Sequence, residues 1–170
     1  MAVANGEMVL HGPARFHQQA QELVNGLLRP RLAGRPVHIA HDADAYSATP
    51  RELASAHAPA PGRRPTWFFL TTPHYHGGPM CRKVGCAAGG KGYEGYWKLQ
   101  NYHRYKDVEA GGLYYVRNYV YVDRTRTRVP GAPRPDPEWV MVEYGIVRED
   151  CSEQELVLCK MYRVNQTMRA

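Results

Sequence analysis

The apolar positions near the N-terminus recur with the period of an α-helix. Between residues 18 and 28 they fall at spacings of three and four, which places them on one helix face. They are Ala20, Leu23, Val24, Leu27 and Leu28. The pattern predicts an amphipathic helix that Gly26 weakens and Pro30 ends, because proline lacks the amide hydrogen that a helical bond needs.

A second, short helix is predicted over residues 49–56. Thr49 can accept a capping hydrogen bond, Pro50 suits the first helical position and Glu52 suits the first turn. Residues 57–65 are rich in Ala, Pro, Gly and Arg, which predicts an exposed connection to the next element.

Five runs rich in Trp, Tyr, Phe, Val and Leu predict strands. They cover residues 67–70, 93–99, 113–122, 139–147 and 156–162. Between residues 72 and 92, glycine and proline are too dense for regular structure over most of the stretch, so a long loop is predicted there. Five strands and two helices predict one α+β domain, mostly β, over residues 1–170.

Composition narrows the class of protein. A chain of 170 residues with 44% apolar content can bury one sizeable core. The N-terminus lacks a signal-peptide pattern, and no apolar run reaches the roughly 20 residues of a membrane span, so we expect a soluble intracellular protein without membrane contact. The four cysteines are too scattered for a disulfide framework, and free thiols are expected.

The net charge of +6 is concentrated in the middle of the chain. Residues 61–97 carry five basic and one acidic side chain, and residues 98–134 carry eight and three. A localised basic region is typical of a protein that binds a polyanion, because lysine and arginine displace the counterions of phosphates. The alternative is a solvated surface with a mild cationic bias.

Three arginines alternate with threonines at Arg124, Arg126 and Arg128. If this segment is extended, the three guanidinium groups lie on one face, where they can bind phosphates together. The alternative is a solvated loop whose arginines keep a sheet edge soluble.

Neither a catalytic site nor a cofactor is predicted. The sequence contains no glycine-rich phosphate loop, no Gly-x-Ser-x-Gly elbow and no His-Glu-x-x-His motif, so we expect no enzyme activity and no small-molecule substrate. Zinc-ligand types occur at His74, His76, Cys81 and Cys86, but their spacing lacks the tight Cys-x2-Cys pair of structural zinc sites. We therefore expect no metal, with zinc at these four residues as the alternative.

Six blocks, in the correct order, resemble the NAC domain of plant transcription factors. The blocks are Arg15-Phe16-His17 with Glu22-Leu23-Val24, Asp44-Ala45-Tyr46 with Pro50-Arg51-Glu52-Leu53, Trp67-Phe68-Phe69, Gly95-Tyr96-Trp97-Lys98, Trp139-Val140-Met141-Val142-Glu143-Tyr144, and Val157-Leu158-Cys159-Lys160-Met161-Tyr162. The resemblance implies a twisted antiparallel sheet of about five to seven strands flanked by a few helices. It also implies a nuclear transcription regulator that binds specific double-stranded DNA as a dimer.

The resemblance divides the chain into two functional parts. Residues 8–56 would supply the helices and the dimer contacts, and residues 66–165 the sheet with its basic, DNA-facing side. Members of the family pair through a short intermolecular strand and an arginine-to-glutamate salt bridge. Leu10 matches the pairing strand, and Arg15 and Glu22 match the salt bridge. The partner would be a second copy or a related NAC protein.

In the family, an edge strand with the pattern Trp-Lys-Ala-Thr-Gly-x-Asp enters the major groove. The matching stretch here is residues 97–103, in which Lys98 is retained and Ala-Thr-Gly has become Leu-Gln-Asn. Gln100 and Asn101 carry amides that can pair with adenine edges, although both also suit a hydrophilic turn. Trp97 is expected to pack in the core rather than on a base.

Several cations would bind phosphates. Arg104 and Lys106 follow the matched strand directly, and Lys91 is the one cation near the position of the family's Asn-Arg, which falls on Gly89-Gly90. The family's Lys-Lys pair falls on Tyr114-Tyr115. Cations expected to compensate from neighbouring positions are Arg117, Arg124, Arg126 and Arg128.

The alternative function is a truncated protein-interaction module. The scaffold blocks match the family better than the groove-facing residues do, and the chain ends at Ala170 without an activation or repression segment. On this hypothesis the protein pairs with intact relatives and binds DNA weakly or not at all.

Overall fold

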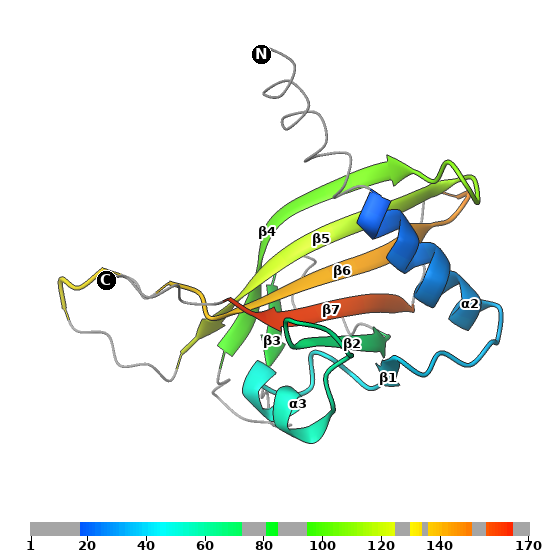
Figure 1. Cartoon of the computed structure of the whole chain (residues 1–170). Helices are drawn as coiled ribbons and strands as arrows, with labels where there is room; N and C mark the ends of the chain where they lie inside the picture. Colours follow the sequence, from blue (N-terminus) through cyan, green and yellow to red (C-terminus); the bar gives the residue numbers. More distant parts are fainter. Residues whose placement is uncertain are drawn as a thin grey trace, which may run out of the picture.

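The computed structural model describes residues 18–72, 81–84, 95–124, 130–133, 136–150 and 156–164, with only the backbone described at 81–84. Their centre is a seven-stranded sheet of order β1-β2-β7-β6-β5-β4-β3 (Figure 1). The strands are β1 (Ala40–Asp42), β2 (Thr66–Thr71), β3 (Cys81–Val84), β4 (Gly95–Lys106), β5 (Leu113–Asp123), β6 (Trp139–Val147) and β7 (Val157–Arg163). All neighbours are antiparallel except β1 and β2. The predicted α+β, mostly β class is confirmed.

All five predicted strands are present, and β4 continues seven residues past its predicted end at residue 99. Two further strands were not predicted. The three residues of β1 form a strand through parallel pairing with β2, which no local pattern indicates. The stretch predicted as a long loop, residues 72–92, contains the short strand β3, which pairs with the first four residues of β4.

The first helix does not end at Pro30, so that prediction was wrong. Residues 18–23 are α-helical, a π-helical segment η1 (Val24–Leu28) follows, and α2 (Arg29–Leu32) continues beyond the proline. The backbone N–H of Arg29 bonds to the carbonyl of Val24, five residues back. This wider turn restarts the helix at Arg29, so Pro30 lies in the first turn of α2, where a backbone N–H is not required.

The second helix is confirmed as α3 (Pro50–Ala56). The Thr49 side chain accepts from the N–H of Glu52 at 3.2 Å, and the Glu52 carboxylate accepts from the N–H of Thr49 at 2.9 Å. This reciprocal pair satisfies two amides at the start of the helix.

Each face of the sheet is covered by one of the helices. On the face that we call the helix face, Val24 and Leu28 of the first helix pack on the buried Tyr114, Val116 and Leu158. On the opposite face, called the α3 face, the core joins Leu53 of α3 to a different set of buried side chains. These are Ala45, Tyr46, Trp67, Phe69, Trp97, Tyr115, Tyr119, Trp139, Met141, Val147, Val157, Cys159 and Met161. None of the helices in the described residues is long and apolar enough to cross a membrane.

Candidate nucleic-acid interface

Most of β4 lies at the edge of the sheet. It pairs with β5 from Gly95 to Lys106, but with β3 only from Gly95 to Lys98. Within the described part of the chain, residues 99–106 therefore have a partner strand on one side only. A projecting strand edge of this kind is narrow enough to approach the major groove of DNA.

A β-bulge interrupts β4 at the centre of the predicted reading segment. Leu99 lies opposite Tyr119 and Asn101 lies opposite Asn118, so Gln100 is the extra residue. The bulge shifts the alternation of the strand, because Leu99 and Tyr102 both pack against the core of the α3 face although they are three residues apart.

The shifted alternation gathers polar side chains on the helix face. Lys98 lies opposite Val120, Asn101 opposite Asn118 and His103 opposite Val116, and regular alternation from Lys98 places Gln100 on the same face. We call this set the polar stripe: Lys98, Gln100, Asn101 and His103. All four side chains are exposed. The structure thus brings together three residues predicted to meet DNA and adds His103.

The remaining predicted cations of β4 lie on the other face. Arg104 and Lys106 are exposed, but they lie opposite Tyr115 and Leu113, whose side chains pack in the core of the α3 face. Arg104 also donates from Nε to the Tyr102 hydroxyl at 2.6 Å. The exposed polar side chains of this one strand therefore lie on both faces of the sheet.

Asn101 is committed to another side chain within the protein. Its Oδ1 accepts from Nδ2 of Asn118 across the sheet at 2.5 Å. Gln100, by contrast, has no hydrogen-bond partner among the described residues. The two amides look equivalent in the sequence, but in the described part of the structure only Asn101 is hydrogen-bonded to another side chain.

Arg117 does not face solvent, and its predicted role as a phosphate-binding cation was wrong. It is 6% exposed, and its guanidinium bonds to the carboxylate of Glu143 at 3.0 Å. The same group stacks 5.0 Å from the ring of Tyr102 and 4.5 Å from that of Tyr115. Burial on the α3 face, paired with a buried carboxylate, leaves this cation unavailable to DNA.

Glu143 also connects Arg117 to the segment between β1 and α3, which packs on the α3 face. Its carboxylate is fully buried and accepts from the Tyr46 hydroxyl at 2.6 Å. The contacts run from Tyr46 through Glu143 and Arg117 to Tyr102, and so reach β4 immediately after the bulge. Sequence reasoning missed this network because its members come from four separate segments.

Three aromatic residues of β4 and β5 are buried, as their residue types suggest. Trp97 is fully buried against Tyr121, with ring centroids 5.2 Å apart, which confirms that it packs in the core. Tyr114 and Tyr115, which stand where the family has two lysines, are also fully buried. Burial, with the charges of Tyr105 and Asp107, raises the pKa of Tyr114 to about 12, so it stays neutral.

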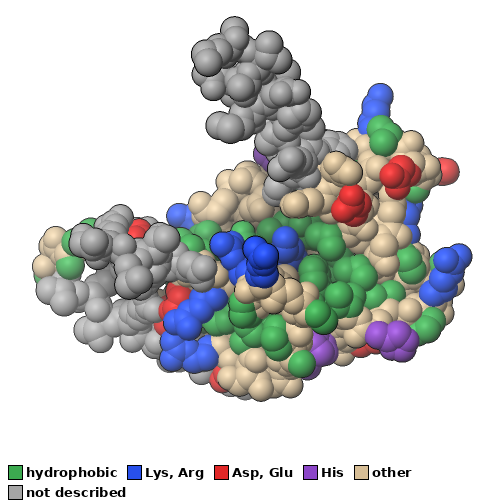
Figure 2. All heavy atoms as spheres, in the orientation of Figure 1, with side chains coloured by type: hydrophobic (Ala, Val, Ile, Leu, Met, Phe, Trp, Pro, Cys, Tyr) green, Lys and Arg blue, Asp and Glu red, His purple; other side chains and the backbone are tan. Residues whose placement is uncertain are grey.

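Lys160 adds a cation to the helix face that the sequence did not indicate. It lies between Phe68 and Val142 on β7, and its ammonium is 5.8 Å from the ring of Tyr162. Burial, together with the charge of Arg64, lowers the pKa of Lys160. Figure 2, which views the molecule with the first helix toward the reader, shows Lys and Arg side chains gathered beside a patch of hydrophobic ones.

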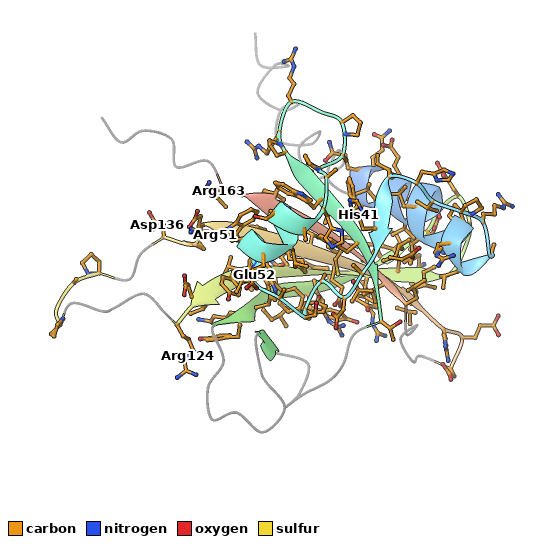
Figure 3. All side chains as sticks on the ribbon, turned by 90° about the horizontal axis from the view of Figure 1, so that it is seen from below. His41, Arg51, Glu52, Arg124, Asp136 and Arg163 are labelled. Atoms are coloured by element: carbon orange, nitrogen blue, oxygen red, sulfur yellow. The ribbon has the colours of Figure 1, made fainter. Side chains whose placement is uncertain are left out.

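A second group of arginines lies on the α3 face. Arg51, Arg64 and Arg163 line a cavity of about 340 Å³ whose wall includes Trp67 and Trp139. In Figure 3, Arg51 and Arg163 lie at the same end of the sheet. Arg163 is paired with Glu138 and stacks over Trp139 at 6.0 Å. These cations face away from the polar stripe.

The other predicted site residues divide between described and undescribed parts of the chain. Arg124 is exposed directly after β5, where it extends from the end of the sheet (Figure 3), and Glu22 is exposed on the first helix. Residues outside the described part are Leu10, Arg15, Lys91, Arg126 and Arg128, together with His74, His76 and Cys86 of the alternative zinc site. Only the backbone is described at Cys81.

A comparison with known protein families identifies the family of this chain. Residues 12–146, most of the chain, match the family described as No apical meristem (NAM) protein. The chain belongs to the NAM family. This is the family of the NAC domain, so the resemblance carried by the six sequence blocks is confirmed. No curated protein matches the chain.

Membership in the NAM family gives the general class of function. NAC-domain proteins are plant transcription regulators and not enzymes, and the family is generally nuclear. The match ends within β6, so β7 lies beyond it although β7 pairs with both β2 and β6. The described fold therefore includes a central strand that the family match does not cover.

Proposed function

We propose that this NAM-family protein is a nuclear regulator that binds specific sequences of double-stranded DNA through the edge of β4. The polar stripe is the observation that carries the proposal. It places Lys98, at the end of the pairing with β3, next to three exposed side chains with hydrogen-bonding groups on the open edge of β4. Hydrogen-bonding side chains on a narrow β element are what direct readout of the major groove requires.

Cations around the stripe would supply most of the affinity. Lys98, Arg104 and Lys106 of β4 and Arg124 after β5 are all exposed. Lys91, Arg126 and Arg128 belong to the same proposal on the basis of sequence alone. Each phosphate that they neutralise releases condensed counterions, which favours binding at low salt.

We also propose that the protein acts as a dimer, with itself or with a related NAC protein. The support is the family resemblance of the N-terminal segment, with Leu10 in a pairing strand and Arg15 bonded to Glu22 of the other copy. The exposure of Glu22 on the first helix is compatible with this contact.

Fluorescence anisotropy with labelled double-stranded DNA at about 50 mM and about 200 mM salt tests DNA binding. We expect affinity to fall steeply between the two concentrations. Lys98→Ala should weaken binding and reduce the slope of log affinity against log salt by about one. Arg51→Ala is the matched control, because it also removes one exposed positive charge, but from α3 beside Trp67 and Trp139 and not from β4, and it should leave the slope unchanged.

Absent or salt-insensitive binding by the folded protein would reject the DNA-binding proposal. The chain would then be better explained as an interaction module that pairs with intact relatives. The equal loss of slope in Lys98→Ala and Arg51→Ala would instead show that binding is diffuse, and would reject the β4 edge as the interface.

A further inference from the structure

We propose that Gln100, and not its neighbour Asn101, is the residue of β4 that selects a base pair, and that the selected base is adenine. The inference rests on the proposed DNA binding of the β4 edge. It depends on how the bulge distributes hydrogen-bonding capacity between two adjacent amides.

Among the described residues, the bulge leaves Gln100 without a pairing partner on either neighbouring strand. It is the one residue of β4 between Gly95 and Lys106 that has no partner residue on β5, and β3 ends its pairing at Lys98. Its side chain is exposed and has no hydrogen-bond partner in the part of the chain that the structure describes. A carboxamide in this state presents one acceptor and two donor hydrogens together.

Adenine is the base that matches this set of groups. In the major groove it offers an acceptor at N7 and a donor at N6, which a glutamine side chain bonds simultaneously. Guanine offers two acceptors, and cytosine one donor, so a carboxamide satisfies neither as completely. An A·T pair is therefore the preferred partner of Gln100.

Asn101 lacks the same freedom. The hydrogen bond from Asn118 uses one of the two lone pairs of its Oδ1 at 2.5 Å and holds the amide toward β5, whereas bidentate pairing with adenine needs Oδ1 and Nδ2 turned together toward the base. Turning Asn101 toward a base would break this bond and leave Asn118 without its acceptor. The asparagine pair instead fixes the strand beside the bulge.

Both flanks of Gln100 are held by the core. Leu99 packs on the α3 face before the bulge, and Tyr102 packs there after it, with the guanidinium groups of Arg104 and Arg117 at 5.8 Å and 5.0 Å from its ring. The register of the bulge is therefore fixed before any ligand binds. A preorganised strand loses little conformational freedom on binding, so the glutamine contact contributes fully to discrimination.

The test is selection from a randomised double-stranded DNA library by the full chain, with the enriched fragments sequenced. For the wild-type protein we expect an A·T pair at one position, favoured by roughly 5-fold to 150-fold over other pairs. Gln100→Glu should change the preference at that position to C·G, because a carboxylate accepts from cytosine N4. Gln100→Ala should remove the preference there and leave the salt dependence of binding unchanged.

Asn101→Asp is the matched control, because it keeps the oxygen that accepts from Asn118 and removes only the amide hydrogens that a base contact would need. It should retain the A·T preference. The side chain of Gln100 is exposed, so we expect its variants to keep the wild-type midpoint of thermal unfolding. Loss of the preference in Asn101→Asp, or an unchanged preference in Gln100→Glu, overturns the assignment. If the library is bound with steep salt dependence but no position is enriched, the assignment fails while polyanion binding stands; if no DNA is retained, the proposed function fails with it.

Discussion

The buried ion pair of Arg117 and Glu143 shows how a single residue can be misassigned from sequence. Arg117 lies in a basic part of the chain, yet Tyr115, Arg117 and Tyr119 share one face of β5, and both tyrosines are fully buried. The period of two in this strand indicates burial for the residue between them. The distribution of charge along the sequence does not reveal that Glu143 lies opposite Arg117 on the neighbouring strand β6.

Removing one partner of this pair should destabilise the fold strongly. Arg117→Met leaves the carboxylate of Glu143 buried without its counter-charge, and Glu143→Leu does the same to the guanidinium of Arg117. We expect each to lower the free energy of unfolding by about 3–5 kcal/mol, measured by urea denaturation. The double variant should cost less than the sum of the two, because no unpaired charge remains. Single variants within about 1 kcal/mol of the wild type would contradict this account.

At the scale of elements, Asp107 connects the turn between β4 and β5 to the first helix through hydrogen bonds and an ion pair. The carboxylate of Asp107 accepts from Nδ2 of Asn25 at 3.2 Å and from Nη2 of Arg29 at 3.2 Å. Within the turn it also accepts from the backbone N–H groups of Glu109 and Ala110 at 3.0 Å and 2.9 Å. The helix and the open edge of the sheet therefore share one buried carboxylate.

Stability should fall in acid because of this carboxylate. Burial acts to raise the pKa of Asp107, but the hydrogen bonds from Ala110, Asn25 and Glu109 and the charge of Arg29 outweigh it, so its pKa lies below the usual 3.8. A lowered pKa in the folded state means that the stabilisation is complete above pH about 4 and is lost as the pH falls through the folded-state pKa.

Asp107→Asn should lower the unfolding free energy by about 1–3 kcal/mol at neutral pH and make it less sensitive to pH below about 4. Denaturation at a series of pH values measures both effects. Glu109→Gln serves as the control, since Glu109 is exposed in the same turn and meets Asn25 only at 3.5 Å. An equal response of the two variants to acid would show that Asp107 has no special role.

Elements that follow from local pattern were predictable, and elements that depend on distant partners were not. The Thr49 cap and the strand at β6 follow from local sequence alone. The bulge left a readable signal, because Trp97 and Leu99 are two residues apart but Tyr102 follows three later. The strand β1, by contrast, exists because β2 lies beside it, and no periodicity in three residues records that.

At the scale of the whole molecule, the proposed DNA contacts and the proposed partner contact belong to different elements of the described fold. The first helix covers the middle of the helix face, and the polar stripe occupies the strand edge beyond it. Glu22 lies on the exposed side of that helix, away from the buried Val24 and Leu28. In the proposed dimer, the partner contact at Glu22 is on the first helix and the DNA contacts are on β4, so the two use different elements, as a dimer that reads two DNA half-sites requires.

The proposed dimer gives a charge-exchange prediction. Arg15→Glu or Glu22→Arg alone places like charges opposite each other across the two-fold interface and should raise the dimer dissociation constant by about tenfold or more. The double variant restores opposite charges in exchanged positions and should recover most of the affinity. Sedimentation velocity across a range of protein concentrations measures all three variants against the wild type.

Single variants that dimerise as well as the wild type would reject the contact between Arg15 and Glu22, and a monomeric wild type would reject the homodimer itself. If both single variants weaken the dimer but the double variant does not recover, the two residues contribute to pairing without contacting each other, and the intermolecular salt bridge is wrong.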